Sequence, residues 1–293
     1  MNKLSIAQLY QVSWTGGMSY VITLRDDGFI IIDGGQGDRF YEAHSKVLYK
    51  YLTDRSGGKK PKILGWFFTH FHLDHVVCAS EFLIKHKDDI EVEGFYINPP
   101  ANDDSNRDFA MEEVLDKGMD AHPDTKRVYL KTGDKFTFPH CTVDMLLTST
   151  DLCRYGYTSP NHVSAVFRMA FDNDTSFLVT GDSDNDRMLR LMDENDTLYR
   201  PFEEIKSDIF QSPHHGRILG NHEEAARFAE VLKMMKPRVA FFPICKESYE
   251  TDEFYLSEDW ADNYYLIHSG ANCFHHSETV TVNLDDFSFE IEE

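Results

Sequence analysis

The sequence predicts an α/β protein with two similar halves in a four-layer αββα arrangement. Short apolar or β-branched segments alternate with segments whose apolar residues recur at helical spacing. This succession of strands and helices occurs twice along the 293 residues, which favours two sheets covered by helices. Hydrophobic residues make up 41% of the chain and aromatic residues 13%. That content supports a large core and excludes a disordered protein.

The first half begins with strands and ends in an alternation of strands and helices. Residues 29–32 form an apolar run that Asp33, Gly34 and Gly35 end, as a strand-end turn does. Residues 63–68 are fully apolar, which is typical of a strand buried in a sheet. The other strands expected in this half are residues 5–12, 18–24 and 91–97, and the expected helices are residues 40–52 and 76–86.

The second half is richer in strands. Residues 98–125 are polar around one short expected helix, 109–118, so they form a candidate insertion within a single domain that spans residues 1–293. The expected strands that follow are 136–138, 142–148, 164–170, 176–180, 209–210, 239–243, 279–284 and 287–291. The expected helices are 184–200 and 222–235.

Composition limits the partners and the compartment. The chain has 29 Lys and Arg against 50 Asp and Glu, a formal net charge of −21, and no basic stripe, which argues against long nucleic acid. Its apolar runs are far shorter than the ~20 residues of a membrane span, so we expect no membrane association. The five cysteines are scattered and form no C-x-x-C pair, and the N-terminus lacks a secretory pattern. These features favour a cytoplasmic protein.

The segment after the apolar strand 63–68 carries the strongest chemical signal. It places His70, His72, Asp74 and His75 within six positions, between a strand and a helix. Side chains two apart on an extended backbone point the same way, so His70 and His72 can hold one ion. Asp74 and His75 turn the corner and can face a second ion. Imidazole and carboxylate ligands together suit zinc, manganese or iron.

Two further strand ends agree with this metal site. Asp182 follows the expected strand 176–180, and His214 and His215 follow the expected strand 209–210. Functional side chains of α/β proteins gather at the carboxyl ends of strands. With Asp182 between two sets of ligands, the site would hold two bridged ions, which lower the pKa of bound water and supply a hydroxide nucleophile.

These motifs resemble those of the metallo-β-lactamase superfamily of metal-dependent hydrolases. The resemblance runs from the turn at Asp33 to about residue 284 and is strongest to the ComEC-like branch, the hydrolase domains of competence proteins and their free-standing relatives. That branch has an Asn-x-x-Ser segment, a Thr-Gly-Asp segment and a Pro-His-His-Gly segment, which correspond here to residues 161–164, 180–182 and 213–216. The resemblance implies the αββα metallo-β-lactamase-like sandwich and two divalent metal ions, zinc above all.

The resemblance also implies a role for each residue. His70 and His72 would hold the first metal, Asp74 and His75 the second, and Asp182 would bridge them. One of His214 and His215 would complete the second metal, and the other would meet the leaving oxygen or phosphate of the substrate. Asp33 resembles the strand-end aspartate that supports the site by hydrogen bonding. The candidate catalytic residues are therefore Asp33, Asp74, His214 and His215.

One position departs from the superfamily pattern. Many members have a histidine ligand just before the strand expected here at residues 164–170, whereas this chain has Asn161 followed by His162. Either His162 serves as the ligand, or the first metal keeps a water there. His268, His275 and His276, near the final strands, are interpreted as supporting or surface residues.

These observations predict a metal-dependent hydrolase that acts on a small-molecule phosphate ester, a phosphoester or phosphodiester, through a hydroxide bridging the metals. A lactone or thioester hydrolase of the same fold is the alternative within the same class. A binding protein that has kept the fold without catalysis is the alternative from a different class.

Overall fold

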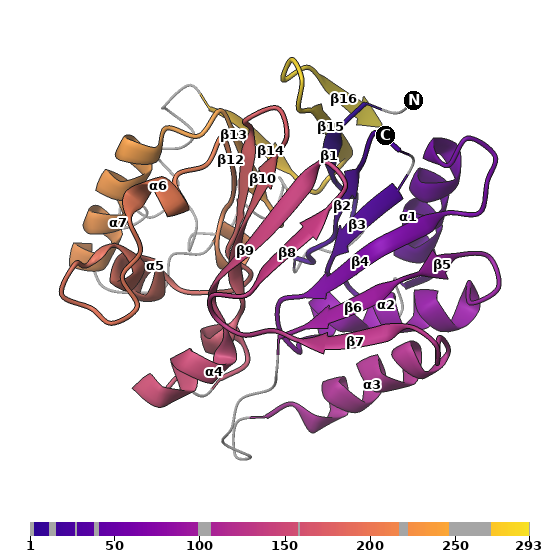
Figure 1. Cartoon of the computed structure of the whole chain (residues 1–293), viewed down its shortest axis with the longest axis horizontal. Helices are drawn as coiled ribbons and strands as arrows, with labels where there is room; N and C mark the ends of the chain where they lie inside the picture. The colour runs from indigo at the N-terminus through magenta and orange to yellow at the C-terminus, as the bar shows by residue number, and fades with distance from the viewer. Residues whose placement is uncertain are drawn as a thin grey trace.

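Two sheets lie face to face with helices on both outer faces (Figure 1), so the predicted αββα arrangement is confirmed. The computed structural model describes residues 3–11, 16–26, 28–37, 41–98, 107–157, 159–216, 222–245 and 271–292. The first sheet has nine strands in the order β16-β15-β1-β2-β3-β4-β6-β7, with β5 also paired to β4, and the second has seven in the order β14-β13-β12-β11-β10-β9-β8.

The strands of the first sheet are β1 (Ser5–Gln8), β2 (Tyr20–Thr23), β3 (Gly28–Ile32), β4 (Lys62–Phe68), β5 (Glu91–Val92), β6 (Gly94–Ile97), β7 (Lys126–Tyr129), β15 (Thr279–Asn283) and β16 (Phe289–Glu292). The strands of the second are β8 (Lys135–Phe138), β9 (Cys141–Leu147), β10 (Val166–Phe171), β11 (Ser176–Val179), β12 (Ile209–Gln211), β13 (Val239–Phe242) and β14 (Asn272–His275). β3, β4, β6 and β7 pair in parallel, as do β11 to β14, so each sheet has a parallel half.

The helices are α1 (Tyr41–Arg55), α2 (Leu73–Lys85), α3 (Phe109–Asp120), α4 (Ser149–Leu152), α5 (Asn185–Met192), α6 (Phe202–Ile205) and α7 (His222–Met235). Short 3₁₀ turns cover Cys153–Tyr155, Asn161–Val163 and His214–Gly216. Helices α1, α2 and α3 cover the first sheet, and α5, α6 and α7 lie beyond the second (Figure 1). The expected insertion at about 98–125 lies partly outside the described residues, and its helix α3 packs against α2.

Three apolar layers hold the sheets and helices together. The central layer fills the space between the sheets, and in it the ring centroids of Phe67 of β4 and Phe167 of β10 lie 5.4 Å apart. The other two layers lie between each sheet and its helices. β4 shows the cause, because its sequence KILGWFF sends Leu64 and Phe67 into the central layer and its other large side chains into the helix-covered layer. The strand is buried at every position but the first. Both faces of this strand are therefore fixed, and its carboxyl end is a rigid support.

One expected helix is shorter than the sequence indicated. Residues 184–200 were expected to be helical throughout, but α5 ends at Met192. Beyond it, the backbone N–H groups of Asn195 and Leu198 donate to the carboxylates of Asp193 and Asp196. Such local side-chain bonds compete with the helical ladder and end it.

Candidate metal centre

The connection from β4 to α2 presents four of the predicted residues. His70 and His72 lie between the end of β4 and the start of α2, and His72 has an extended backbone at φ −124°. The helix begins at Leu73, three residues earlier than expected, so Asp74 and His75 occupy its first turn. The carboxylate of Asp74 thus lies at the positive end of the helix dipole, which favours its charged form.

Asp182 is fixed by a turn after β11. The backbone N–H groups of Thr180 and Gly181 both donate to Oε1 of Gln211 at 2.8 Å, and the N–H of Asp182 donates to Oγ of Ser164 at 3.1 Å. Asp182 itself is 1% exposed. Because Gln211 of β12 and Ser164, just before β10, hold this turn, the buried carboxylate has a defined direction.

The turn after β12 sends its two histidines in different directions. His214 and His215 have positive φ values of 46° and 60°, a backbone conformation that residues other than glycine rarely adopt. His215 is held by a hydrogen bond from Nδ1 to the carbonyl oxygen of Pro243 at 2.8 Å. That bond leaves Nε2 of His215 directed at the carboxylates of Asp74 and Asp182. The ring of His214 lies farther out, with Nδ1 3.4 Å from Oδ1 of Asp184 and Nε2 3.9 Å from Oδ2 of Asp182.

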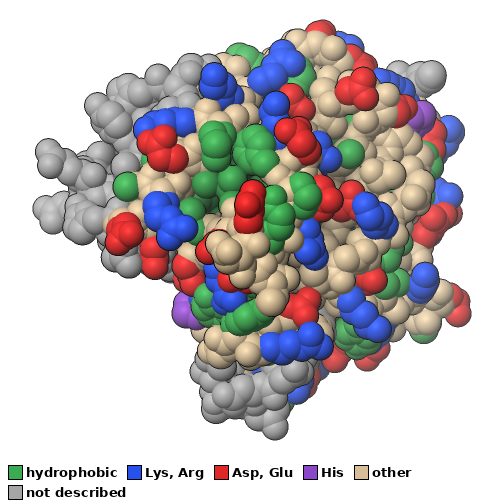
Figure 2. All heavy atoms as spheres, turned by 60° about the vertical axis from the view of Figure 1, so that its left-hand side comes forward, with side chains coloured by type: hydrophobic (Ala, Val, Ile, Leu, Met, Phe, Trp, Pro, Cys, Tyr) green, Lys and Arg blue, Asp and Glu red, His purple; other side chains and the backbone are tan. Residues whose placement is uncertain are grey.

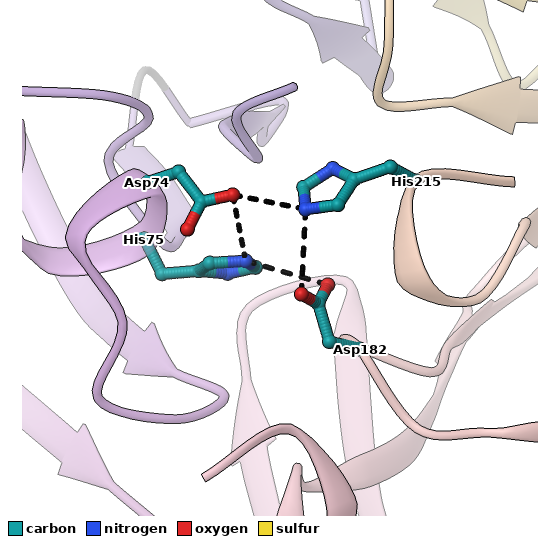
Figure 3. A group of neighbouring side chains, drawn as sticks. All are labelled: Asp74, His75, Asp182 and His215. Atoms are coloured by element: carbon teal, nitrogen blue, oxygen red, sulfur yellow. Dashed lines mark ion pairs between the residues drawn. The ribbon is translucent and has the colours of Figure 1, made fainter. Parts of the chain in front are cut away.

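Asp74, His75, Asp182 and His215 form the first group of donors that could hold a metal ion (Figure 3). Nε2 of His215 lies 2.9 Å from Oδ2 of Asp74 and 3.3 Å from Oδ2 of Asp182. Nε2 of His75 lies 3.4 Å from Oδ1 of Asp182 and 3.8 Å from Oδ2 of Asp74. Two nitrogen and two carboxylate donors that converge in this way suit a divalent transition metal.

His70, His72 and Asp182 form a second such group, which shares Asp182 with the first. Nε2 of His70 lies 3.7 Å from Oδ2 of Asp182, and the rings of His70 and His72 meet edge to face with centroids 4.8 Å apart. A carboxylate common to both groups can face two ions. With Asp33, which contacts His75, the structure therefore brings together seven positions that the sequence singled out.

Asp33 lies behind the first group, directly after β3. Its Oδ2 is 2.7 Å from Nδ1 of His75 and accepts a hydrogen bond from Oγ1 of Thr69 at 2.7 Å, while its Oδ1 accepts the N–H of Thr69 at 2.8 Å. Asp33 is fully buried. By accepting the Nδ1 proton of His75, it leaves Nε2 of that ring as the free donor to an ion.

His162 and His214 lie outside both groups among the described residues. Nε2 of His162 lies 3.3 Å from Oδ2 of Asp184, and its side chain is 41% exposed. Nδ1 of His214 lies 3.4 Å from Oδ1 of Asp184, and Nε2 of His214 meets the side-chain amide of Asn161 at 3.1 Å. Asp184 thus holds both histidines beside the cluster and pairs with Arg187 at 2.5 Å.

The charges of the cluster attract cations. Burial alone would lower the pKa of His75, but the surrounding carboxylates, Asp182 above all, raise it to about 10. The pKa of His215 is likewise raised well above its ordinary value against the effect of burial. Burial would raise the pKa of Asp182, yet His215 and His75 hold it well below its usual range. A buried site whose carboxylates draw positive charge so strongly is suited to a metal ion.

Unpartnered buried atoms test whether a metal fits. Nε2 of His70, Nε2 of His75 and Oδ1 of Asp182 are buried and have no hydrogen-bond partner. Leaving such atoms unsatisfied costs free energy, so buried polar groups are normally paired. All three belong to the two groups of donors, and metal coordination would satisfy each of them. The residues therefore fit a bound metal.

Two supporting residues were not singled out by the sequence. Thr69 directly follows β4, and its Oγ1 donates a hydrogen bond to Asp33 and lies 3.1 Å from Nδ1 of His70. Asp184 orients His162 and His214. Thr69 directly precedes the histidine segment and Asp184 follows Asp182 by two positions, so proximity to the motifs was the only signal available for either.

Comparisons with known proteins agree with this picture. The family model described as metallo-beta-lactamase superfamily matches residues 12–242. No sequence among the curated proteins matches the chain. Among solved structures, the metallo-beta-lactamase fold protein YhfI from Bacillus subtilis is similar, with a TM-score of 0.56 and 12% identity, over 96% of this chain and 100% of that one.

Two other solved structures share the fold. CmlA, a diiron beta-hydroxylase from Streptomyces venezuelae, has a TM-score of 0.54 and 12% identity over 97% of this chain and 55% of that one. A protein from Veillonella parvula described as a possible metal-dependent hydrolase has a TM-score of 0.51 and 10% identity over 97% of this chain and 100% of that one. At these identities the likeness concerns the fold alone.

Within the described ranges, every helix is too short or too polar to reach across a lipid bilayer.

Proposed function

Because the chain belongs to the metallo-β-lactamase superfamily, we propose that it is a metal-dependent hydrolase whose centre holds two divalent ions, zinc in the first place and manganese or iron as alternatives. The single observation that carries this proposal is the coincidence of orphaned atoms and donors. Three of the buried side-chain atoms without a hydrogen-bond partner belong to His70, His75 and Asp182, all of which are members of the two donor groups.

The residues have separate roles in this proposal. Asp74, His75, Asp182 and His215 would hold one ion, and His70, His72 and Asp182 the other. Bound divalent ions would lower the pKa of a coordinated water and neutralise negative charge on a substrate. Asp33 fixes the ring of His75 through the 2.7 Å contact with Nδ1 and acts as a positioning residue.

His214 is the residue that we propose meets the substrate. It lies outside both donor groups, yet its Nε2 is 3.9 Å from Oδ2 of Asp182 and 3.1 Å from the amide nitrogen of Asn161. Because Nδ1 of His214 contacts Asp184, Nε2 of the same ring points toward the donor groups and Asn161. His214 could there contact the leaving oxygen of an ester, and its fixed direction would reduce the reorganisation needed for that contact.

The proposed substrate class is a small phosphoester or phosphodiester. The motifs that resemble the ComEC-like branch support this class, and we propose that the chain belongs to that branch. Its Asn-x-x-Ser, Thr-Gly-Asp and Pro-His-His-Gly segments supply Asn161 and Ser164, Asp182, and His214 with His215. Ser164 and Asp182 are joined by a hydrogen bond, and Asn161 contacts His214.

A small substrate fits the surface charge better than long nucleic acid does. On the face drawn in Figure 2, Lys and Arg side chains are interspersed with Asp and Glu side chains and do not gather into a stripe. The net charge of the chain is −21. A long polyanion would be repelled by this negative charge over its whole length. A small ester would be attracted mainly by the two proposed ions beside it, because charges beyond a Debye length of ~8 Å are largely screened. The scattered cysteines, none of which forms a disulfide, support the proposal of a cytoplasmic enzyme.

The test is turnover by metal-loaded protein on three generic esters: an aryl phosphate monoester, a bis-aryl phosphodiester and an aryl lactone. We expect hydrolysis of a phosphate ester, no steep loss of rate with salt, and poor cleavage of long duplex DNA. An Asp182→Asn variant purified in the same way controls for contaminating phosphatases. Lactone hydrolysis without phosphate ester hydrolysis would move the assignment to the lactone and thioester hydrolases. Lack of turnover on every ester by fully loaded protein would favour the non-catalytic binding protein.

A further inference from the structure

A polar pocket of about 200 Å³ lies on the helix-covered face of the first sheet, away from the metal centre. Ser5 and Thr23 line it, and their neighbours of the same strand parity, Ala7 and Val21, belong to the apolar layer beneath the helices. Thr23 pairs with Phe29 near the start of β3, whereas Asp33 follows the end of β3. The pocket and the metal centre therefore lie at opposite edges of the sheet.

Register places a row of polar side chains across the floor of this pocket. Ser5 of β1 is paired with Thr23 of β2 on one side and with Asn283 of β15 on the other. The amide of Asn283 donates to Oγ of Ser288, 3.5 Å away, which extends the row toward β16. Ser5, Thr23 and Asn283 are 5%, 1% and 8% exposed. Burying polar side chains costs free energy unless hydrogen-bond partners satisfy them. A bound polar ligand would supply such partners to this row.

Thr23 supplies a second, independent observation. Its hydroxyl is buried and has no hydrogen-bond partner. The hydroxyl of Thr281, which also lines the pocket, at least meets the hydroxyl of Tyr51 at 3.4 Å. An orphaned hydroxyl in the lining of a polar pocket is what a site for a hydroxyl-bearing ligand would show when that ligand is not bound.

The charges of the lining select the kind of ligand. Arg55 is engaged, because it pairs with Glu292 at 2.9 Å and lies over the ring of Tyr51 at 3.7 Å. Lys3 lies in the lining and is exposed, and it forms no ion pair within 4 Å with a described carboxylate, although its charge helps to lower the pKa of Asp286. Glu290, also in the lining, disfavours a ligand of higher negative charge. One exposed ammonium group without a close ion-pair partner among the described carboxylates, beside a row of hydroxyl and amide groups, matches a hydroxylated monoanion.

We propose that this pocket is a second binding site, for a small hydroxy carboxylate. The hydroxyl groups of the ligand would bond the row formed by Thr23, Ser5 and Asn283, and its carboxylate would pair with Lys3. The site is separate from the metal centre and does not depend on the proposed hydrolase activity.

Glycerate is the probe, with glycerol and acetate as controls that carry only the hydroxyls or only the charge. Binding to the full chain is measured by titration calorimetry and by the shift in melting temperature. We expect glycerate to bind and both controls to bind far more weakly. Thr23→Val removes the hydroxyl at nearly constant volume and should weaken glycerate binding about fivefold, the loss typical of one neutral hydrogen bond. Lys3→Gln should weaken it about threefold and make it insensitive to salt.

Ser45→Ala is the matched control, because Ser45 in α1 also has a buried hydroxyl without a partner but lies outside the pocket lining. Both Thr23→Val and Ser45→Ala should raise the melting temperature without ligand, but only Thr23→Val should lose the response to glycerate. Thr23→Ser should restore it. Equal glycerate binding by wild type and Thr23→Val, or acetate binding as tight as glycerate binding, would overturn the proposal. If glycerate bound at the metal centre instead, wild type and Thr23→Val would bind it equally.

Discussion

The carboxylate of Asp33 lies 2.7 Å from Nδ1 of His75, and both side chains are fully buried. Asp33 belongs to the strand-end turn after β3, while His75 belongs to the first turn of α2. The backbone reinforces this link, because the N–H of Gly34 donates to the carbonyl oxygen of His75 at 2.8 Å. The tautomer of a proposed metal-binding histidine is thus fixed by a residue that is distant in sequence.

This relationship predicts different effects for two aspartates. Asp33→Asn should lower metal affinity about 10- to 100-fold, the usual result of losing a partner behind a metal-binding histidine. Asp182→Asn should remove most bound metal, because Asp182 is common to both donor groups. Metal per chain, measured by mass spectrometry after dialysis against a weak chelator, separates the two. Equal metal loss in both variants would contradict this division of roles.

The two donor groups should not bind metal equally. One group has four residues and the other has three, and His162 is turned to Asp184 instead of supplying a fourth donor. Titration of metal-free protein with zinc should therefore show two steps, the first tighter by about tenfold or more, which corresponds to about 1.4 kcal/mol. His72→Ala should abolish only the weaker step, and His215→Ala should weaken the tighter one. Two equal steps that His72→Ala leaves unchanged would contradict the assignment.

Gly16 is expected to control the position of His215. Its φ is +90°, and a Cβ atom at Gly16 would lie 2.7 Å from Nδ1 of His215. Gly16→Ala should therefore displace the imidazole and lower metal affinity by at least about tenfold. Gly133→Ala is the matched control, since Gly133 has a φ of +87° and open space around its Cβ position. Both variants place alanine at a positive φ, so both carry the same kind of backbone strain. A lower metal affinity in Gly16→Ala alone would therefore come from the contact between the new Cβ atom and His215.

The sequence predicted this cluster of candidate metal donors because most of its residues are close together along the chain. His70, His72, Asp74 and His75 sit in one segment after an apolar strand, and the parallel strands β3, β4, β11 and β12 bring their carboxyl ends together. The division of labour between His214 and His215 could not be predicted in this way. It depends on positive φ values at both residues and on the carbonyl of Pro243, which are properties of the folded backbone.

Two strands escaped prediction for a physical reason. β7 has the sequence KRVY and forms the edge of its sheet, so it needs little apolar burial and shows no apolar pattern. β14 is the edge strand of the second sheet, and its sequence NCFH is only partly buried. Both strands are defined by backbone hydrogen bonds to the adjacent strand and not by side-chain periodicity. The prediction for His268 lies outside the described residues, whereas His276 is fully buried.

His276 predicts a loss of stability in acid. Burial lowers the pKa of His276 to about 3, although Nδ1 lies 3.1 Å from the carbonyl oxygen of Gly17. The folded protein therefore keeps this ring neutral, while the unfolded chain takes up a proton below pH ~6.5. Since the unfolded state binds more protons between these two values, this contribution to stability is fully present above pH ~6.5 and is lost as the pH falls toward 3.

The measurement compares wild type with His276→Asn, which keeps a donor near the carbonyl oxygen of Gly17 but does not titrate. Urea unfolding of metal-free protein at pH 7.5 and 5.5 avoids any contribution from metal release. Wild type should lose about 1.4 kcal/mol more than the variant between these values, because one pH unit below ~6.5 costs about that amount for a single suppressed protonation. Other titrating groups are common to both proteins and cancel in the difference. If both proteins lose the same free energy of unfolding, His276 takes up its proton in the folded state and is not held neutral by burial.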